Sequence, residues 1–150
     1  IFLKKLQEIT SNVKFDLYGI NNIQPIWADS FLKSISNAKM GVNLSRGNPI
    51  KYYSSDRITQ LIGNGLLTFI HKDTYYNNFF SKDEVIFYTN ISNLSEKIQK
   101  FAKDDHARRK IAKKGKKKYM KYFNSTIVAD YIINNTFDVK YNKSKYLWDK

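Results

Sequence analysis

Residues 54–70 read SSDRITQLIGNGLLTFI, and this stretch decides the fold class. Ser54, Ser55 and Asp56 are all good helix N-caps, and the apolar positions after them recur at helical spacing. Glycines then end the helix, and residues 66–70 form a continuous apolar run. Such a run, between glycine and a polar loop, is typical of a strand buried on both faces of a parallel sheet. The stretch therefore predicts a helix that leads directly into a central strand.

Period-two patterns on either side of this stretch predict further strands. Apolar and polar residues alternate over residues 13–17, which end at Gly19, and again over residues 38–44. A short apolar run at residues 85–88 predicts another strand. Long connections rather than tight hairpin turns join these segments, which favours βαβ units. We therefore expect an α/β fold: a Rossmann-like three-layer domain with a mostly parallel sheet.

Helical segments alternate with these strands, and most of them begin at residues that can cap a helix. The expected helix starts are the apolar run at residues 1–9, Asp29 or Ser30, Asn93 with Glu96, Asp104 or Asp105, and Ser125 or Thr126. The helix after Asp105 is expected to bury Ala107, Ile111, Gly115, Tyr119 and Tyr122 or Phe123. After Phe137 the periodicity ends, so we expect a domain over residues 1–137 and a polar tail over residues 138–150.

The composition restricts the chemistry open to the chain. Cysteine is absent, which excludes a disulfide framework, a thiolate nucleophile and a cysteine-ligated zinc site. Because Ile1 already lies inside an amphipathic helical pattern, we expect the domain to be incomplete at its N-terminus. No apolar run approaches the roughly 20 residues that span a bilayer.

The net charge of +13 by itself suggests nucleic acid, an anionic membrane surface or a phosphorylated ligand as a partner. Much of this charge lies in one segment, residues 103–121, and the remainder is scattered. The chain is also rich in Asn, Ile, Tyr and Lys, a bias that AT-rich coding produces unaided. The distribution of the charge is therefore more informative than its size.

In open parallel sheets, ligands bind beyond the carboxyl ends of the strands, which selects the loops after Tyr18, Leu44 and Ile70. The second of these loops runs into a helix N-terminus, where unpaired N–H groups favour phosphate. Its cations and hydroxyl donors are Arg46, Lys51, Arg57, Ser54 and Ser55. The alternative is that the serines only cap the helix and that Arg57 pairs with Asp56 at the surface, and on the residues alone this is the commoner arrangement.

Blocks of this sequence also occur in an order and spacing typical of one family. They are residues 13–19, a strand ending in glycine; residues 38–45, AKMGVNLS; residues 56–70, DRITQLIGNGLLTFI; residues 84–88, EVIFY; residues 93–98, NLSEKI; and residues 108–115, RRKIAKKG. Over residues 13–137 the chain thus resembles the carboxy-terminal, donor-binding domain of group 1 glycosyltransferases of the GT-B fold. Within that group it is most similar to the spore-maturation-protein-like branch.

The resemblance implies a glycosyltransferase domain that holds a nucleotide-diphosphate sugar as substrate, while a separate N-terminal GT-B domain holds a glycan or lipid-linked acceptor. It implies no cofactor and no metal, in keeping with the absence of any Asp-x-Asp motif, and a leaving diphosphate stabilised by the helix start and basic side chains. The family often has glutamates where Lys51 and Thr59 stand here. A degenerate, non-catalytic domain is therefore an alternative. Any catalytic base is expected outside this chain, and the catalytic residues are unknown.

Other residues have weaker claims to the site. Gly19 ends a predicted strand, His71 follows the central strand, and Trp27 could stack on a base or fill the core under its loop. The basic helix at residues 105–121 is a solvated face by default. It could otherwise dock on anionic lipid, which would put a cytoplasmic protein at the inner face of the membrane. A basic α/β module that binds nucleic acid is the competing function, although no recognised nucleic-acid motif is present.

Overall fold

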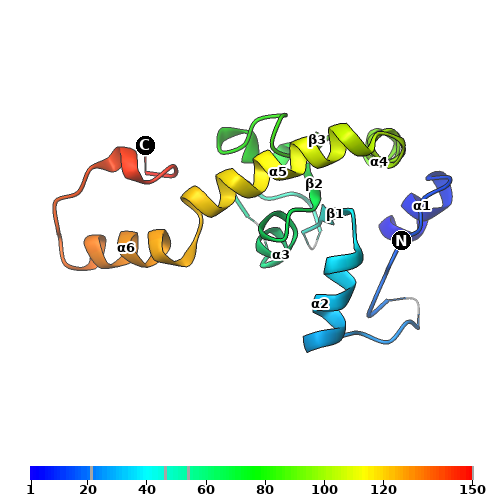
Figure 1. The fold of residues 1–150 in the computed structure, drawn as a ribbon, viewed down its shortest axis with the longest axis horizontal. Coiled ribbons are helices and arrows are strands. Elements are labelled where there is room, and N and C mark those ends of the chain that lie inside the picture. Colours follow the sequence, from blue (N-terminus) through cyan, green and yellow to red (C-terminus); the bar gives the residue numbers. More distant parts are fainter. Residues whose placement is uncertain (21, 46, 54, 150) are drawn as a thin grey trace.

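The structure is a computed structural model, and it describes residues 1–20, 22–45, 47–53 and 55–149. Its sheet has three parallel strands in the order β1-β2-β3, so β2 lies in the centre (Figure 1). The strands are β1 (Met40–Asn43), β2 (Leu67–His71) and β3 (Ile86–Tyr88). The register places Met40 opposite Leu67 and Phe69 opposite Ile86. The prediction of a Rossmann-like α/β domain with a parallel sheet is confirmed.

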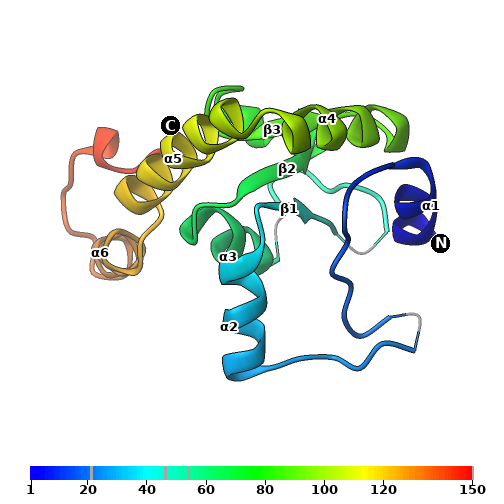
Figure 2. The same cartoon turned by 45° about the vertical axis from the view of Figure 1, so that its right-hand side comes forward.

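Helices connect and cover the strands (Figure 2). The α-helices are α1 (Phe2–Ile9), α2 (Ala28–Asn37), α3 (Arg57–Gly63), α4 (Ile91–Lys103), α5 (Asp105–Tyr122) and α6 (Ser125–Thr136). Short 3-10 turns are η1 (Lys72–Thr74), η2 (Tyr76–Asn78) and η3 (Lys143–Lys145). None of the helices within the described ranges is long and apolar enough to cross a membrane.

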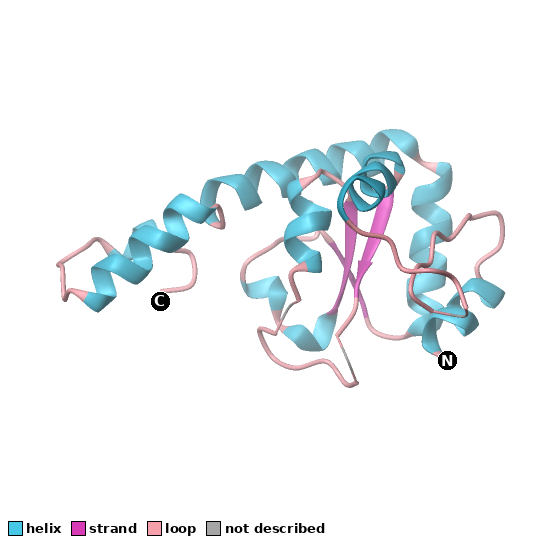
Figure 3. Cartoon of the chain, turned by 90° about the horizontal axis from the view of Figure 1, so that it is seen from below, coloured by secondary structure: helices cyan, strands magenta, loops and turns pink. Residues whose placement is uncertain are grey.

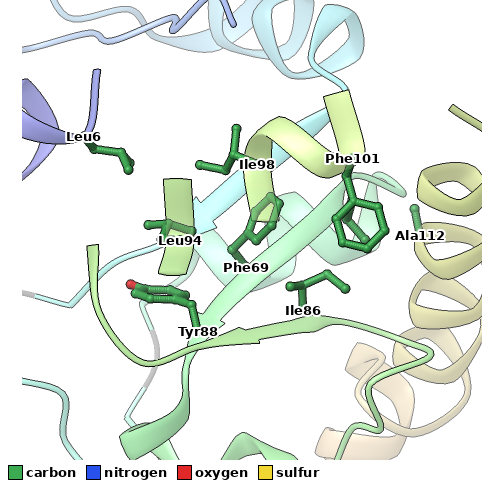
Figure 4. Close-up of a cluster of buried hydrophobic side chains, with 9 residues drawn as sticks. Leu6, Phe69, Ile86, Tyr88, Leu94, Ile98, Phe101 and Ala112 are labelled. Atoms are coloured by element: carbon green, nitrogen blue, oxygen red, sulfur yellow. The ribbon is translucent and has the colours of Figure 1, made fainter. Parts of the chain in front are cut away.

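The central strand β2 is buried on both faces, as the apolar run predicted. On one face Leu67 and Phe69 join a cluster formed with α1, β3, α4 and α5 (Figure 4). On the other face Ile70 packs with Ile58 and Ile62 of α3 and with side chains that precede β3. Burying side chains of this size stabilises the fold by about 2 kcal/mol each. The sheet therefore lies between two apolar layers and needs no disulfide or metal.

The expected strand at residues 13–17 does not form. Val13 and Phe15 are half-buried and pack against the core cluster, but the segment is irregular, and the described sheet ends at β1. The alternation of apolar and polar residues therefore reports which side chains face the core. It cannot report whether a neighbouring backbone is present to pair with the segment.

The helix caps differ from the expected ones at several starts. The residue before α2 is Trp27, which has no capping side chain, so neither Asp29 nor Ser30 caps it. For α4 the Oδ1 atom of Asn90 accepts from the N–H of Asn93 at 2.9 Å, one turn before the predicted start. Likewise Asn124, and not Ser125 or Thr126, caps α6. Of the residues expected to open the basic helix, Asp104 is confirmed as the cap of α5.

The inner face of α5 is close to the predicted one, with an addition. Gly115 is buried, and the other predicted positions are half-buried. A Cβ atom at Gly115 would lie 2.2 Å from the carbonyl oxygen of Glu84, so only glycine lets the helix approach the segment before β3. Ala112 is buried beside them, and the charged addition is Arg108, a buried arginine that the pattern of apolar residues did not indicate.

The segment after Phe137 folds back beside α6, at the end of the molecule away from the sheet (Figure 3). Tyr146 is only 1% exposed. Its ring packs 4.9 Å from the ring of Tyr131 and 5.9 Å from that of Trp148, and its hydroxyl is bonded to Asn134 and Asp130. Composition alone predicted a polar tail because these aromatic contacts have no period along the chain.

Candidate functional site

The loops that follow β1 and β2 pack together at the carboxyl edge of the sheet. The backbone N–H of Tyr52 donates to the carbonyl oxygen of Thr74 at 2.8 Å. The Tyr52 hydroxyl accepts from Nδ2 of Asn78 at 2.6 Å, and its ring centroid lies 5.2 Å from that of Phe79. The loop that was selected from the sequence is therefore held against η1 and η2.

Arg57, the first residue of α3, faces the end of β1. Its Nη1 atom donates to the carbonyl oxygen of Leu44 at 2.5 Å and to Oγ of Ser55 at 3.2 Å. Both bonds use Nη1, and an arginine carries further N–H groups on Nε and Nη2. The side chain is exposed. The guanidinium is therefore held at the carboxyl edge while other donors remain for a ligand at this edge.

Lys51 lies in the same loop and is also exposed. Its Nζ atom is 5.0 Å from the ring centroid of Tyr52 and 5.6 Å from that of Tyr75. Contacts of an ammonium with aromatic faces at this range are favourable by roughly 0.5–1 kcal/mol at exposed sites. Lys51 is thus positioned by rings from both loops, and a phosphate would have to compete only with these weak contacts.

The remaining loop residues contribute in part. Asp56 directly precedes α3, but its side chain makes no capping hydrogen bond. Ser55 accepts from Arg57, so its described role is to orient the guanidinium. Arg46 and Ser54, which the sequence also placed in the site, lie outside the described residues.

Thr59 turns toward α5. Its Oγ1 atom lies 2.8 Å from the hydroxyl of Tyr119, so its polar contact is with a helix and not with the loops at the carboxyl edge. This contact links the first turn of α3 to α5. The residue at the expected glutamate position is therefore already engaged within the chain.

His71 ends β2 at the same edge, and backbone groups occupy both ring nitrogens. Nδ1 accepts from the N–H of Asp73 at 3.2 Å, which caps η1, and Nε2 lies 2.9 Å from the carbonyl oxygen of Thr89. Because Nδ1 is the acceptor, Nε2 carries the proton and donates to Thr89. The ring also packs edge-on against Tyr88, whose pKa burial raises to about 12. This geometry gives His71 a structural role.

Gly19 and Trp27 lie in the segment between α1 and β1. Gly19 adopts a φ of +74° in a turn where its N–H donates to the carbonyl oxygen of Ile23, so it ends a turn and not a strand. Trp27 is 67% exposed, which contradicts the expectation that its ring fills the core under its loop. The segment around Trp27 is too thin to cover a ring of that size, because α2 itself buries no residue.

Asn43 is a residue of this edge that the sequence did not single out. It is the last residue of β1, it is 4% exposed, and its Oδ1 atom is buried without a hydrogen-bond partner among the described residues. A buried carbonyl oxygen without a partner costs roughly 1–3 kcal/mol. In the period-two pattern, Asn43 occupies one of the polar positions of the strand, which would ordinarily face solvent. Asn43 could have been found from the sequence as a polar side chain on a strand that is covered on both faces.

The aromatic residues of the basic helix are packed and do not form a free stacking surface. The ring of Phe123 stacks 5.5 Å from Tyr119 and 5.5 Å from Phe80. On the same helix Lys118 bonds to Glu84 at 2.9 Å. Burial raises the pKa of the Glu84 carboxyl, but hydrogen bonds from Ser81 and Lys118 outweigh it and hold the pKa below its ordinary value.

Histidine and acidic side chains are scattered in the part of the chain that the structure describes. No group of three or more His, Asp or Glu side chains lies together there. The cations at the carboxyl edge, Lys51 and Arg57, suit an anionic ligand.

Comparison with known proteins places the chain in a family. A family model described as "Glycosyl transferase-like" matches residues 1–134 of the 150. No curated protein and no solved structure gives a significant match. The matched region includes the whole sheet and both loops of the carboxyl edge. The chain therefore belongs to the glycosyl transferase-like family.

Proposed function

We propose that this domain binds a nucleotide-diphosphate sugar at the carboxyl edge of its sheet and presents the sugar for transfer to a glycan or lipid-linked acceptor. The acceptor would be held by a separate N-terminal domain of the GT-B type, and transfer would need no metal. Membership of the glycosyl transferase-like family supports the reaction class. The position of Arg57, held against the end of β1, is the observation that carries the proposed site.

The diphosphate would lie between Arg57 and the loop that carries Lys51. A guanidinium can bind two phosphate oxygens at once through its planar N–H groups, and the amino end of α3 adds backbone N–H donors. When the bond between sugar and phosphate breaks, negative charge grows on the leaving diphosphate. Positive side chains close to the leaving oxygens stabilise that charge electrostatically.

Asn43 supports the same edge from a different direction. Its unpartnered Oδ1 atom is an acceptor at the end of β1, next to the carbonyl oxygen that holds Arg57. A ligand group with an N–H or O–H would compensate for the burial of this oxygen if the loop after β1 opened slightly. We propose that Asn43 contributes such a contact to the donor.

The absence of glutamates at positions 51 and 59 leaves two variants of the proposal. The ammonium of Lys51 has no acceptor for a sugar or ribose hydroxyl, and the hydroxyl of Thr59, which already contacts Tyr119, lacks the charge of a carboxylate. In the first variant the domain is an active transferase with altered donor contacts. In the second it is a degenerate domain that binds the donor without transfer. Retention of nucleotide binding is common to both.

A nucleic-acid module is the competing function, and the packing of Tyr119 and Phe123 disfavours it because their rings face Phe80 and each other. The lysines of α5 remain a surface that could contact anionic lipid. For this reason, and because the proposed acceptor is lipid-linked, we propose a cytoplasmic protein that lies peripherally at the membrane.

The test is a calorimetric titration of the chain with a panel of nucleoside diphosphates and their sugar conjugates. Arg57→Ala removes the guanidinium and is expected to weaken binding about tenfold to a hundredfold, because charge-assisted bonds to phosphate contribute roughly 1.5–3 kcal/mol. The control is Lys110→Ala, which removes one exposed cation from α5, away from the carboxyl edge. Equal affinity of the Arg57 variant and the parent chain would overturn the proposed site.

A further inference from the structure

A second group of cations surrounds a depression at the opposite edge of the sheet. The depression has a volume of about 420 Å³, and the basic side chains that line it are Lys39, Arg108, Arg109, Lys113 and Lys116. No acidic residue is among its lining residues. Positive charge is therefore concentrated around a space large enough for a small ligand.

Packing brings this group together from segments far apart in the sequence. Lys39 directly precedes β1, and its carbonyl oxygen accepts from the N–H of Leu67 at the start of β2. Gly65, two residues before β2, lies so close to Lys116 that an added Cβ would be 3.3 Å from its Cδ. The depression thus lies where the first two strands begin, and α5 closes it with residues between Arg108 and Lys116.

Arg108 gives the depression a fixed cation. Its side chain is 6% exposed, and it pairs with Asp105 through Nη2. A guanidinium carries five N–H donors, more than one carboxylate oxygen can use. The hydrogen bond from Arg108 lowers the pKa of the Asp105 carboxyl, so this partner remains charged at neutral pH. The guanidinium therefore stays in place without a ligand and has capacity for a second anion.

The charge around Arg108 is only partly neutralised. Asp105 pairs with Arg108 and also with Nε of Arg109 at 2.6 Å, so one carboxylate serves two arginines. By contrast, no ion pair within the described ranges involves Lys113 or Lys116, whereas Lys39 interacts with the charge of Asp105 without forming an ion pair.

Other lysines of α5 differ in this respect. Lys114 lies 3.6 Å from a carboxylate oxygen of Asp83, and Lys118 lies 2.9 Å from one of Glu84. Lys113 and Lys116, which line the depression, therefore face a side of α5 where no carboxylate pairs with them. An anionic ligand would supply there what Asp83 and Glu84 supply elsewhere on α5.

We propose that this depression binds a phosphate group, as a monoester or diphosphate, with Arg108 as the central contact and Lys113 and Lys116 closing over it. The phosphate could belong to a soluble metabolite or to a lipid headgroup, since both present the same oxygens. The site lies at the opposite edge from Arg57, so it does not depend on the proposed donor site.

The test is an NMR titration of the whole chain with inorganic phosphate and with pyrophosphate, followed through the backbone amides of Asn64, Gly65 and Ala112. The site variant is Lys113→Gln with Lys116→Gln. The matched control is Lys110→Gln with Lys117→Gln, which removes the same charge from exposed positions of α5 outside the depression. These exposed changes leave the buried Arg108 in place, so folding is preserved.

We expect saturable shifts at these amides and about tenfold weaker binding in the site variant than in the control, equivalent to the loss of contacts from both lysines. Flotation with phosphatidylcholine vesicles, with and without phosphatidic acid, distinguishes the source of the phosphate. Binding to the acidic vesicles that fails in the site variant identifies a lipid headgroup, and binding of soluble phosphate alone identifies a metabolite. Equal weakening in both variants, or no shift with either anion and no vesicle binding, would overturn the proposal.

Discussion

The two edges of the sheet hold their cations in different ways. At the carboxyl edge, Arg57 and Lys51 are exposed and rest on a carbonyl oxygen and aromatic rings. At the amino edge, Arg108 is buried and its neighbours line a depression. The two cations of the first arrangement come from one stretch of sequence, whereas the lining of the second comes from three separate segments. Rules that read a sequence locally therefore find the first edge and miss the second.

The two edges also differ in how freely their cations can move. If the proposed donor binds at the carboxyl edge, the exposed side chains there can move as its sugar leaves, whereas the amino edge holds a buried, paired guanidinium in place. A rigid site loses less entropy on binding but fits fewer ligands. We expect broad nucleotide tolerance at the carboxyl edge and sharper selectivity at the amino edge.

The largest loss of stability is expected from Gly115→Ala, because the added methyl group pushes α5 away from the segment before β3. The new methyl group would lie 2.2 Å from the carbonyl oxygen of Glu84, so backbone must shift, at a cost of about 3 kcal/mol. Urea unfolding measures the change. The same substitution at Gly63, where a Cβ would meet Met120 at an ordinary 3.9 Å, should be neutral or slightly stabilising. Equal stability of the two variants would contradict the close contact.

A smaller, pH-dependent loss of stability is expected from Asp105→Asn, which removes the charged partner of Arg108 at the amino edge. The pKa of Asp105 is lowered in the folded chain by the bond from Arg108, so its contribution is present above the unfolded value of 3.8 and is lost as pH falls through the folded pKa. The variant should be less stable than the parent at neutral pH. Urea unfolding at several pH values should show the difference shrinking below pH 3.8. A constant difference across that range would show that Asp105 does not act through its charge.

The smallest effect is expected from Asn43→Leu at the carboxyl edge. Replacing a buried oxygen that has no partner with an apolar side chain should leave the free chain equally stable or stabilise it by about 1 kcal/mol. If Asn43 contacts the donor, nucleotide affinity should fall in the same variant. Thermal unfolding and a nucleotide titration together check this. A clear loss of stability would instead mean that Oδ1 has a structural partner, such as an ordered water.

The sequence predicted the sheet well because its strands are decided by burial. Residues 66–70 are apolar on both faces, and only a central strand of a covered sheet tolerates that. The extended segment at residues 13–17 shows the limit of the same reasoning. Its alternation predicted a strand, and that prediction was wrong, although Val13 and Phe15 do pack against the core. Pairing depends on a neighbouring backbone that no local pattern contains.

The site was predictable only in part, for a similar reason. Arg57 and Lys51 lie in the loop that strand order selects, and the structure holds both at the carboxyl edge. Trp27 could not be placed, because its exposure depends on how little the α2 segment packs on the rest. Arg108 looked like one more charge in a basic helix, and its burial follows only from the approach of α5 to the strands.

The hydroxyl contact between Thr59 and Tyr119 has a consequence for communication between the edges. The same helix carries Arg108, roughly 16 Å away along its axis. A ligand that displaced α5 at one end would move the start of α3 at the other. Thermodynamic reciprocity then requires that each ligand change the equilibrium affinity of the other by the same factor. Tyr119→Phe removes the hydroxyl contact but keeps the ring packed against the cluster of Ile58 and Ile62 in α3, so it measures how much the hydroxyl pair contributes to such coupling.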